Sequence, residues 1–115
     1  MEQVDQLENA TENAYYAAIF SSQRTEGDHG YVHMLEKMVE LASRQPGFLG
    51  IESVTDSSGA GITVSYWDSL EAINNWRNDQ SHMRAKHQGA QTWYHNFQTR
   101  ICRIEGSYSA AGQHS

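Results

Sequence analysis

Residues 45–76, QPGFLGIESVTDSSGAGITVSYWDSLEAINNW, hold the strongest structural signals in this chain of 115 residues. Gln45-Pro46-Gly47 predicts the end of a helix, because the residue before a proline avoids helical angles and the glycine supplies a turn. Residues 48–55 and 62–67 are short and rich in β-branched and aromatic residues, and the glycine-containing segment 56–61 separates them. Two such strands joined by a short turn predict a β-hairpin, after which a second helix begins.

The segments before this stretch predict a strand and a helix. Residues 15–23 are apolar without clean alternation, which is typical of a strand that is covered on both faces. Residues 28–45 form an amphipathic pattern with helical spacing. The predicted apolar face of this helix consists of Tyr31, Met34, Leu35, Met38, Leu41 and Ala42.

The C-terminal part predicts two further helices and a strand. Asp68 or Ser69 can cap the helix that carries Leu70, Ile73 and Trp76 on its apolar side. Polar residues 78–80 are expected to break this helix. A third helix is then expected from Ser81 to about Gln98, with Met83, Ala90, Trp93, Tyr94 and Phe97 on one face. Residues 99–108 predict the final strand.

The order β-α-β-β-α(α)-β predicts an α+β fold of the ferredoxin-like class, with a four-stranded antiparallel sheet and helices on one face. The helices cover only one face of this sheet. Because the first strand is apolar on both sides, the other face of the sheet must be covered as well. A second copy of the sheet is the simplest cover, so we expect a homodimer. Residues 15–108 are the predicted domain, residues 1–14 a flexible lead-in and residues 109–115 a flexible tail.

Charge and composition argue against two classes of partner, nucleic acids and membranes. The formal net charge is -6 at pH 7, whereas binding nucleic acid requires clustered Lys and Arg. No apolar run approaches the roughly 20 residues that span a bilayer, and residues 1–14 lack the pattern of a secretory signal. Cys102 is the single cysteine, which suits a reducing compartment. We therefore expect a cytoplasmic protein with neither a nucleic acid nor a membrane as partner.

The run Gln45-Pro46-Gly47-Phe48-Leu49-Gly50, the hairpin ending in Ser65-Tyr66-Trp67-Asp68-Ser69, and the following Glu71-Ala72 and Trp76 resemble antibiotic biosynthesis monooxygenase domains. The resemblance covers roughly residues 15–108 and is most specific in YWDSLEAINNW. It implies a dimeric α+β barrel of two ferredoxin-like sheets, with a pocket between the sheet and the helices of each subunit. Some members of this family oxygenate aromatic polyphenols with no metal or organic cofactor, and others bind and break down haem.

The haem-degrading branch has an Asn on the first strand, a Trp after the hairpin and a His about ten residues later. Trp76 matches this Trp, and His87 matches this His after a shift of one residue. The first strand has no Asn, and Ser22 and Gln23 are the polar residues available there. The expected cofactor is therefore none, with haem as the alternative.

His87 and Trp76 are the candidate catalytic residues. A neutral imidazole at position 87 can accept a proton from a phenol or ligate iron. The alternative is a half-buried histidine bonded to a backbone carbonyl. The resemblance places Trp76 at the pocket, and the alternative for it is packing in the core.

The candidate substrate-binding residues come from two sheet strands, the predicted third helix and the last strand. Aromatic side chains are expected to line a flat cavity, and Arg103 or its neighbour Arg100 to pair with a phenolate or carboxylate. The alternative for the aromatic residues is packing in the core. The alternative for the arginines is a solvated charge on an edge strand. The candidates are Phe20, Ser22, Tyr66, Trp67, Trp93, Tyr94 and Arg103.

Metal binding is not predicted. His29 and His33 have a spacing compatible with a metal site, but no third ligand converges on them, and both are assigned to the polar face of a helix. Three functions remain open: a cofactor-independent monooxygenase of an aromatic or quinol-type molecule, a haem-binding or haem-degrading monooxygenase, and a non-enzymatic dimer that binds a small ligand.

Overall fold

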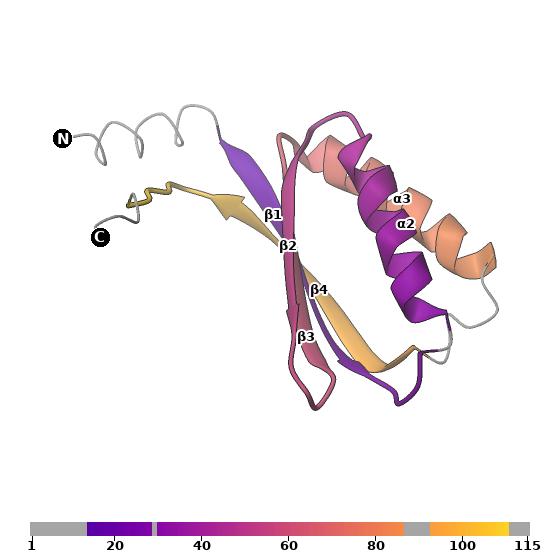
Figure 1. Cartoon of the computed structure of the whole chain (residues 1–115). Helices are drawn as coiled ribbons and strands as arrows, with labels where there is room; N and C mark the ends of the chain where they lie inside the picture. Colours follow the sequence, from indigo (N-terminus) through magenta and orange to yellow (C-terminus); the bar gives the residue numbers. More distant parts are fainter. Residues whose placement is uncertain (1–13, 29, 87–92, 111–115) are drawn as a thin grey trace.

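The computed structural model describes residues 14–28, 30–86 and 93–110, and of residues 81–86 the backbone alone. It confirms the α+β fold and the order β-α-β-β-α-β (Figure 1). The strands are β1 (Tyr15–Arg24), β2 (Phe48–Thr55), β3 (Ala60–Trp67) and β4 (Tyr94–Ile104), and the helices are α2 (Tyr31–Ser43) and α3 (Leu70–Lys86).

The four strands form one antiparallel sheet in the order β2-β3-β1-β4. This is the ferredoxin-like arrangement, in which the first and third strands lie at the centre of the sheet. Both helices cover the same face of the sheet, and the outer ends of β1 and β4 project together beyond the helical layer (Figure 1).

Strand alternation divides the sheet into two faces. The inner face, which points towards the helices, includes Ala18 and Phe20 of β1, which pair with Ser65 and Thr63 of β3. The opposite, open face has no covering layer among the described residues. We define the open face by the cross-strand sets from all four strands: Tyr15, Ala17, Ile19, Gly50, Glu52, Val54, Ile62, Val64, Tyr66, Arg100, Cys102 and Ile104.

The core lies where the end of β3 meets the end of α2 and the start of α3. Trp67 is fully buried there, together with Ala42 and Ile73, and Ala72 and Trp76 are nearly so. The Trp67 ring lies edge-on to Phe48, with the centroids 5.5 Å apart, and is stacked on Trp76 at 6.1 Å. Its Nε1–H donates to the buried Ser65 Oγ at 2.8 Å, so the one polar group of the indole is satisfied.

The helix boundaries follow the local signals of the motif. α2 ends at Ser43, just before Gln45-Pro46-Gly47, and Gly47 has a φ of 89°. The Ser69 Oγ accepts a hydrogen bond from the Ala72 N–H at 3.0 Å, which makes Ser69 the cap of α3.

The prediction for residues 78–98 was wrong in two places. α3 continues through residues 78–80 to Lys86, and β4 begins at Tyr94, inside the segment assigned to a third helix. Asn and Asp lower helix stability by less than about 1 kcal/mol each, and α3 contains no Gly or Pro to stop it. The helical spacing of Trp93, Tyr94 and Phe97 is outweighed by pairing with β1, where Phe97 lies opposite Ser22.

Candidate functional site

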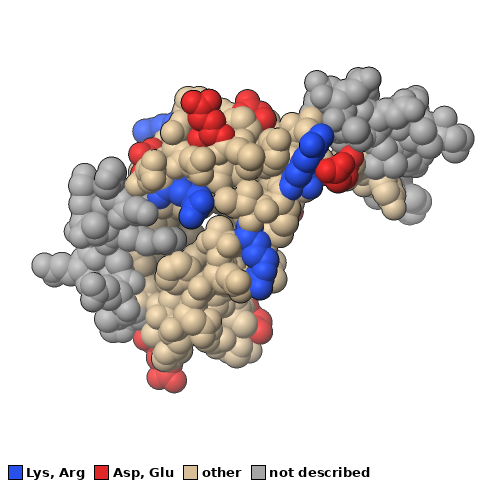
Figure 2. Space-filling model, turned by 180° about the vertical axis from the view of Figure 1, so that it is seen from behind, with Lys and Arg blue, Asp and Glu red and all other residues tan. Residues whose placement is uncertain are grey.

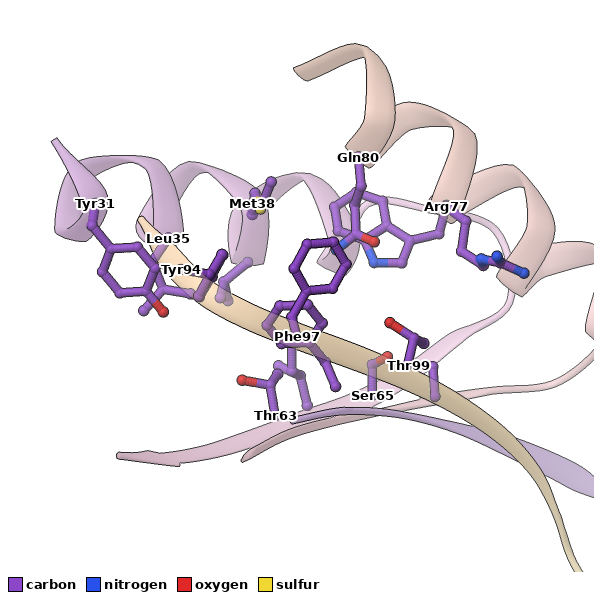
Figure 3. Close-up of a pocket in the computed structure, with 15 residues that line it drawn as sticks. Tyr31, Leu35, Met38, Thr63, Ser65, Arg77, Gln80, Tyr94, Phe97 and Thr99 are labelled. Carbon is purple, nitrogen blue, oxygen red and sulfur yellow. The ribbon is translucent and has the colours of Figure 1, made fainter. Parts of the chain in front are cut away.

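A cavity of about 320 Å³ lies between the inner face of the sheet and the two helices (Figure 3). Its volume lies near the lower end of the range for small-molecule sites. α2 contributes Tyr31, Leu35, Met38 and Val39, and α3 contributes Trp76, Arg77 and Gln80. The sheet contributes Ala18, Phe20, Ile51, Thr63, Ser65, Tyr94, Phe97 and Thr99.

Aromatic side chains from four elements line this pocket. The Phe20 ring lies 5.3 Å from Tyr94, edge-on, and 5.4 Å from Phe97, stacked, between ring centroids. Tyr31 is perpendicular to Tyr94 at 5.8 Å, and Trp76 also lines the cavity. We call Phe20, Tyr31, Trp76, Tyr94 and Phe97 the aromatic wall. Such a wall offers ring faces and edges on which a planar ligand can stack.

Arg24 fixes one end of the aromatic wall. Its guanidinium carbon lies 3.6 Å from the centroid of the Tyr31 ring, a cation–π contact. The same side chain donates from Nε to the Trp93 carbonyl at 3.4 Å and from Nη2 to the Gly27 carbonyl at 3.0 Å. Arg24 thereby joins the end of β1, the start of α2 and the start of β4.

Polar groups of the pocket come from the sheet and from α3. The Thr63 hydroxyl is 2.7 Å from Ser53 Oγ, and Ser65 accepts from Trp67, so both already have partners. Thr99, Gln80 and Arg77 complete the polar lining. Arg77 is the only charged side chain among the described residues that line the cavity.

Three of the candidate site residues line the pocket: Phe20, Trp76 and Tyr94. His87 lies outside the described residues, so its prediction stays a prediction. Trp93 is 2% exposed and packs against the Tyr31 ring at 5.9 Å, so it supports the aromatic wall from behind.

The other four candidates lie elsewhere, which corrects the predicted cavity. Trp67 is part of the core, and Tyr66, its neighbour in the strand, therefore points to the open face. Arg103 lies beyond the pocket and forms an exposed ion pair of 3.4 Å with Glu105. Ser22 lines a separate shallow hollow with residues of β4.

The first strand does not direct an amide or hydroxyl into the pocket, because Phe20 occupies that position. Gln23 donates instead to the Ser58 carbonyl at 2.7 Å. Among the described residues of β1, those that line the pocket are Ala18 and Phe20, and neither is a counterpart of the Asn of the haem-degrading branch.

Tyr31, Arg24 and Arg77 are residues of the site that sequence reasoning did not assign to it. Tyr31 belonged to the predicted apolar face of the first helix, which was a usable signal. The cation–π contact of Arg24 depends on tertiary packing, and the sequence carries no signal for it.

The predictions about metal binding and membranes can be compared with the described residues. Within residues 14–28, 30–86 and 93–110, no three His, Cys, Asp or Glu side chains converge as a metal-ligand group. His33 is exposed, and His29 is outside the described residues. None of the described helices has the length and apolarity needed to cross a membrane. On the face shown in Figure 2, Lys and Arg side chains lie at separate positions.

On the open face, the Tyr66 hydroxyl donates to Glu52 Oε2 at 2.7 Å. This hydrogen bond, followed by partial burial and the charge of Glu52, raises the pKa of Tyr66 above its usual 10.0. The neutral phenol is thus favoured in the folded state. A raised folded pKa means that the stabilisation is complete below pH 10 and is lost as the pH rises through the folded pKa.

We expect Tyr66→Phe to lower the free energy of unfolding by about 0.5–1.5 kcal/mol at pH 8, the usual net contribution of one hydrogen bond. The difference between the two proteins should vanish above the raised pKa. Urea unfolding at fixed protein concentration between pH 8 and pH 11 measures it. Tyr108→Phe, at an exposed position, is the control and should show no such convergence. A difference that is constant across this range would exclude the linkage.

The comparisons with known proteins agree with this architecture. The family model of antibiotic biosynthesis monooxygenases matches residues 14–88. The uncharacterized protein YqjZ of Bacillus subtilis (strain 168) is 49% identical over 102 residues, which cover 89% of this chain and 90% of that protein.

Solved structures show the same fold at low sequence identity. SnoaB, a cofactor-independent oxygenase from Streptomyces nogalater, is similar with a TM-score of 0.62 and 10% identity, over 86% of this chain and 94% of that one. A protein of unknown function from Nitrosomonas europaea has a TM-score of 0.67 and 12% identity, over 87% and 98% of the two chains. At these identities the likeness establishes the fold alone.

Proposed function

Because the chain belongs to the antibiotic biosynthesis monooxygenase family, we propose that it is a monooxygenase of an electron-rich aromatic molecule such as a quinol. The observation that carries this proposal is the cavity of about 320 Å³ with its aromatic wall. A flat ring can stack there between the sheet and the helices. The name of SnoaB as a cofactor-independent oxygenase supports a reaction without metal or organic cofactor.

The chemistry requires a substrate that supplies electrons to dioxygen. Deprotonation of a quinol hydroxyl produces an electron-rich anion that can reduce dioxygen directly. With naphthalene-1,4-diol the products are 2-hydroxy-1,4-naphthoquinone and water. One oxygen atom forms the new carbon–oxygen bond, and the other leaves as water with the hydrogens that quinone formation releases. His87 is our proposed general base, and Trp76 is proposed to hold the ring.

We further propose a homodimer, formed by packing two open faces together. Ile19, Ile62, Val64 and Val54 lie on this face, and Val54 is 72% exposed in the single chain. Exposed apolar surface of this extent favours burial against a second copy. The single cysteine suits a cytoplasmic site of action. Sedimentation equilibrium of the purified protein should give twice the subunit mass of 13.0 kDa.

The test is oxygen uptake with naphthalene-1,4-diol under ¹⁸O₂, corrected for autoxidation. We expect hydroxyquinone labelled with ¹⁸O to form at a rate proportional to the enzyme concentration. Simple autoxidation produces the unhydroxylated quinone and hydrogen peroxide instead, so the label and a peroxide assay separate the two. His87→Ala should lower kcat/KM by about 100-fold, the usual contribution of a general base. Trp76→Phe should raise KM, because a smaller ring leaves part of the pocket unfilled.

His33→Ala is the matched control, since His33 is exposed on α2 and outside the pocket. Its kinetics should equal those of the wild type. Rates that are the same in all four proteins would exclude the proposed roles of His87 and Trp76. Absence of labelled product with any quinol would favour a non-enzymatic ligand-binding dimer. A stoichiometric Soret band that His87→Ala abolishes would instead favour haem binding.

A further inference from the structure

Arg77 stands out among the residues that line the pocket. The protein has a formal net charge of -6, yet the described lining has no carboxylate and a single cation, the guanidinium of Arg77. An arginine keeps its charge at any pH at which the protein is folded. The pocket therefore presents a permanent positive charge to its contents.

The charge of Arg77 is not neutralised by the rest of the described chain. No ion pair or hydrogen bond joins its side chain to another described residue. Neighbours on a helix surface are three and four positions apart, and for Arg77 these are Ile73, Asn74, Gln80 and Ser81. None of them is acidic, so α3 supplies no competing carboxylate. No described residue occupies the guanidinium donors of Arg77, so these donors can bind a ligand.

The position of Arg77 gives the pocket two different ends. In Figure 3, Arg77 and Thr99 lie towards one end of the cavity, and Tyr31 and Leu35 lie towards the other. Trp76 immediately precedes Arg77 on α3 and belongs to the aromatic wall. A ring held by the aromatic wall can thus carry a substituent towards the guanidinium and the Thr99 hydroxyl.

We propose that Arg77 selects aromatic ligands that carry a carboxylate, so that the substrate of this pocket is an anionic aromatic acid. This inference rests on the proposed function for the location of the ligand and deepens it by naming the substrate class. A planar guanidinium matches a carboxylate with two parallel hydrogen bonds, a geometry that lysine cannot reproduce. Since Arg77 is exposed to water, the expected preference is modest, about tenfold in Kd over a neutral ligand of the same shape.

Calorimetric titration with 2-naphthoate and with 2-naphthamide measures the preference without requiring turnover. The two ligands share ring and shape and differ in charge. The wild type should bind 2-naphthoate about tenfold more tightly. Arg77→Gln should abolish the preference by weakening the binding of 2-naphthoate, and Arg77→Lys should retain part of it.

Arg44→Gln is the matched control, because it changes the net charge equally but removes an exposed arginine that is paired with Glu40 outside the pocket. It should keep the full preference. A preference that survives Arg77→Gln, or that Arg44→Gln also removes, overturns the assignment of Arg77. Equal binding of both ligands to the wild type overturns it too, but leaves the pocket and the proposed oxygenase intact. If neither ligand binds, while labelled hydroxyquinone forms from the neutral diol, the substrate class is wrong and the oxygenase stands.

Discussion

Trp67→Ala is expected to lower the free energy of unfolding by about 3–5 kcal/mol, the range for removing a large aromatic residue from a core. The indole is fully buried and contacts both helices through Ala42, Ala72 and Ile73. Because a domain of this size has only about 5–15 kcal/mol of stability, the melting temperature should fall by roughly 15 °C or more.

Part of that loss is polar and can be measured separately. Ser65→Ala removes the acceptor of the Trp67 Nε1–H and leaves a buried donor unsatisfied, at a cost of about 1–3 kcal/mol. In a Trp67→Phe background the donor is gone, so the same serine substitution should cost much less. Urea unfolding of the four proteins at one fixed concentration gives this cycle, and the concentration matters because dimerisation adds to apparent stability. Equal costs in both backgrounds would show that the hydrogen bond contributes nothing.

The hairpin and the first helix were predictable because their signals are local. Pro46 and Gly47 end α2 through their own backbone preferences, and the β-branched residues on both sides of the turn at residues 56–61 favour strands whatever packs on them. The turn is held by Asp56, whose carboxylate accepts from Ser58 and Ala60. The hydrogen bonds, first that of the Ser58 hydroxyl, keep the pKa of Asp56 below its usual 3.8.

The boundary between α3 and β4 was not predictable, because local and tertiary preferences disagree there. Trp93, Tyr94 and Phe97 repeat at a helical spacing, yet Tyr94 and Phe97 both contact Phe20 from a strand. In β4 they flank the bulge opposite Gln23 and Arg24, and this irregularity permits both rings to reach the pocket. The pairing of β4 with β1 determines this arrangement, and the sequence of β4 alone does not contain it.

The candidate site was predicted only in part, because some of its residues carry a signal in the sequence and others depend on tertiary contacts. The resemblance placed Trp76 at the pocket, and the aromatic character of Phe20 and Tyr94 indicated a ring-lined cavity. Arg77 was passed over in favour of Arg103, although it directly follows Trp76. The charged residue of a site depends on which strand end and which helix turn face each other, and sequence spacing does not contain this information.

Gly47→Ala is expected to destabilise the protein by about 2–5 kcal/mol, although Gly47 lies in a turn outside the core. Its φ of 89° costs about 1–2 kcal/mol for a residue with a side chain. A Cβ at this position would also lie 2.5 Å from Asp68 Oδ1 and 2.7 Å from Ala72 Cβ, so the start of α3 would have to move. Overpacking of this kind typically adds about 1–3 kcal/mol.

Gly30→Ala separates the two contributions. Gly30 has a similar φ of 80°, but a Cβ there would meet nothing within 4 Å. It should therefore show the backbone cost alone, and the difference between the two variants in urea unfolding measures the contact of Gly47 with α3. Equal destabilisation of the two variants would mean that the contact is absorbed without cost.

The same contact connects the fold to the pocket. The Gly47 carbonyl accepts a hydrogen bond from the Asp68 N–H at 2.9 Å, so residues 47 and 68 hold the start of α3 against the end of α2. α3 also carries Trp76 and Arg77, two turns further along the helix. A displaced helix start should therefore weaken binding of 2-naphthoate in Gly47→Ala but not in Gly30→Ala. This gives a physical reason for a glycine at position 47, because it permits the close approach that positions both residues.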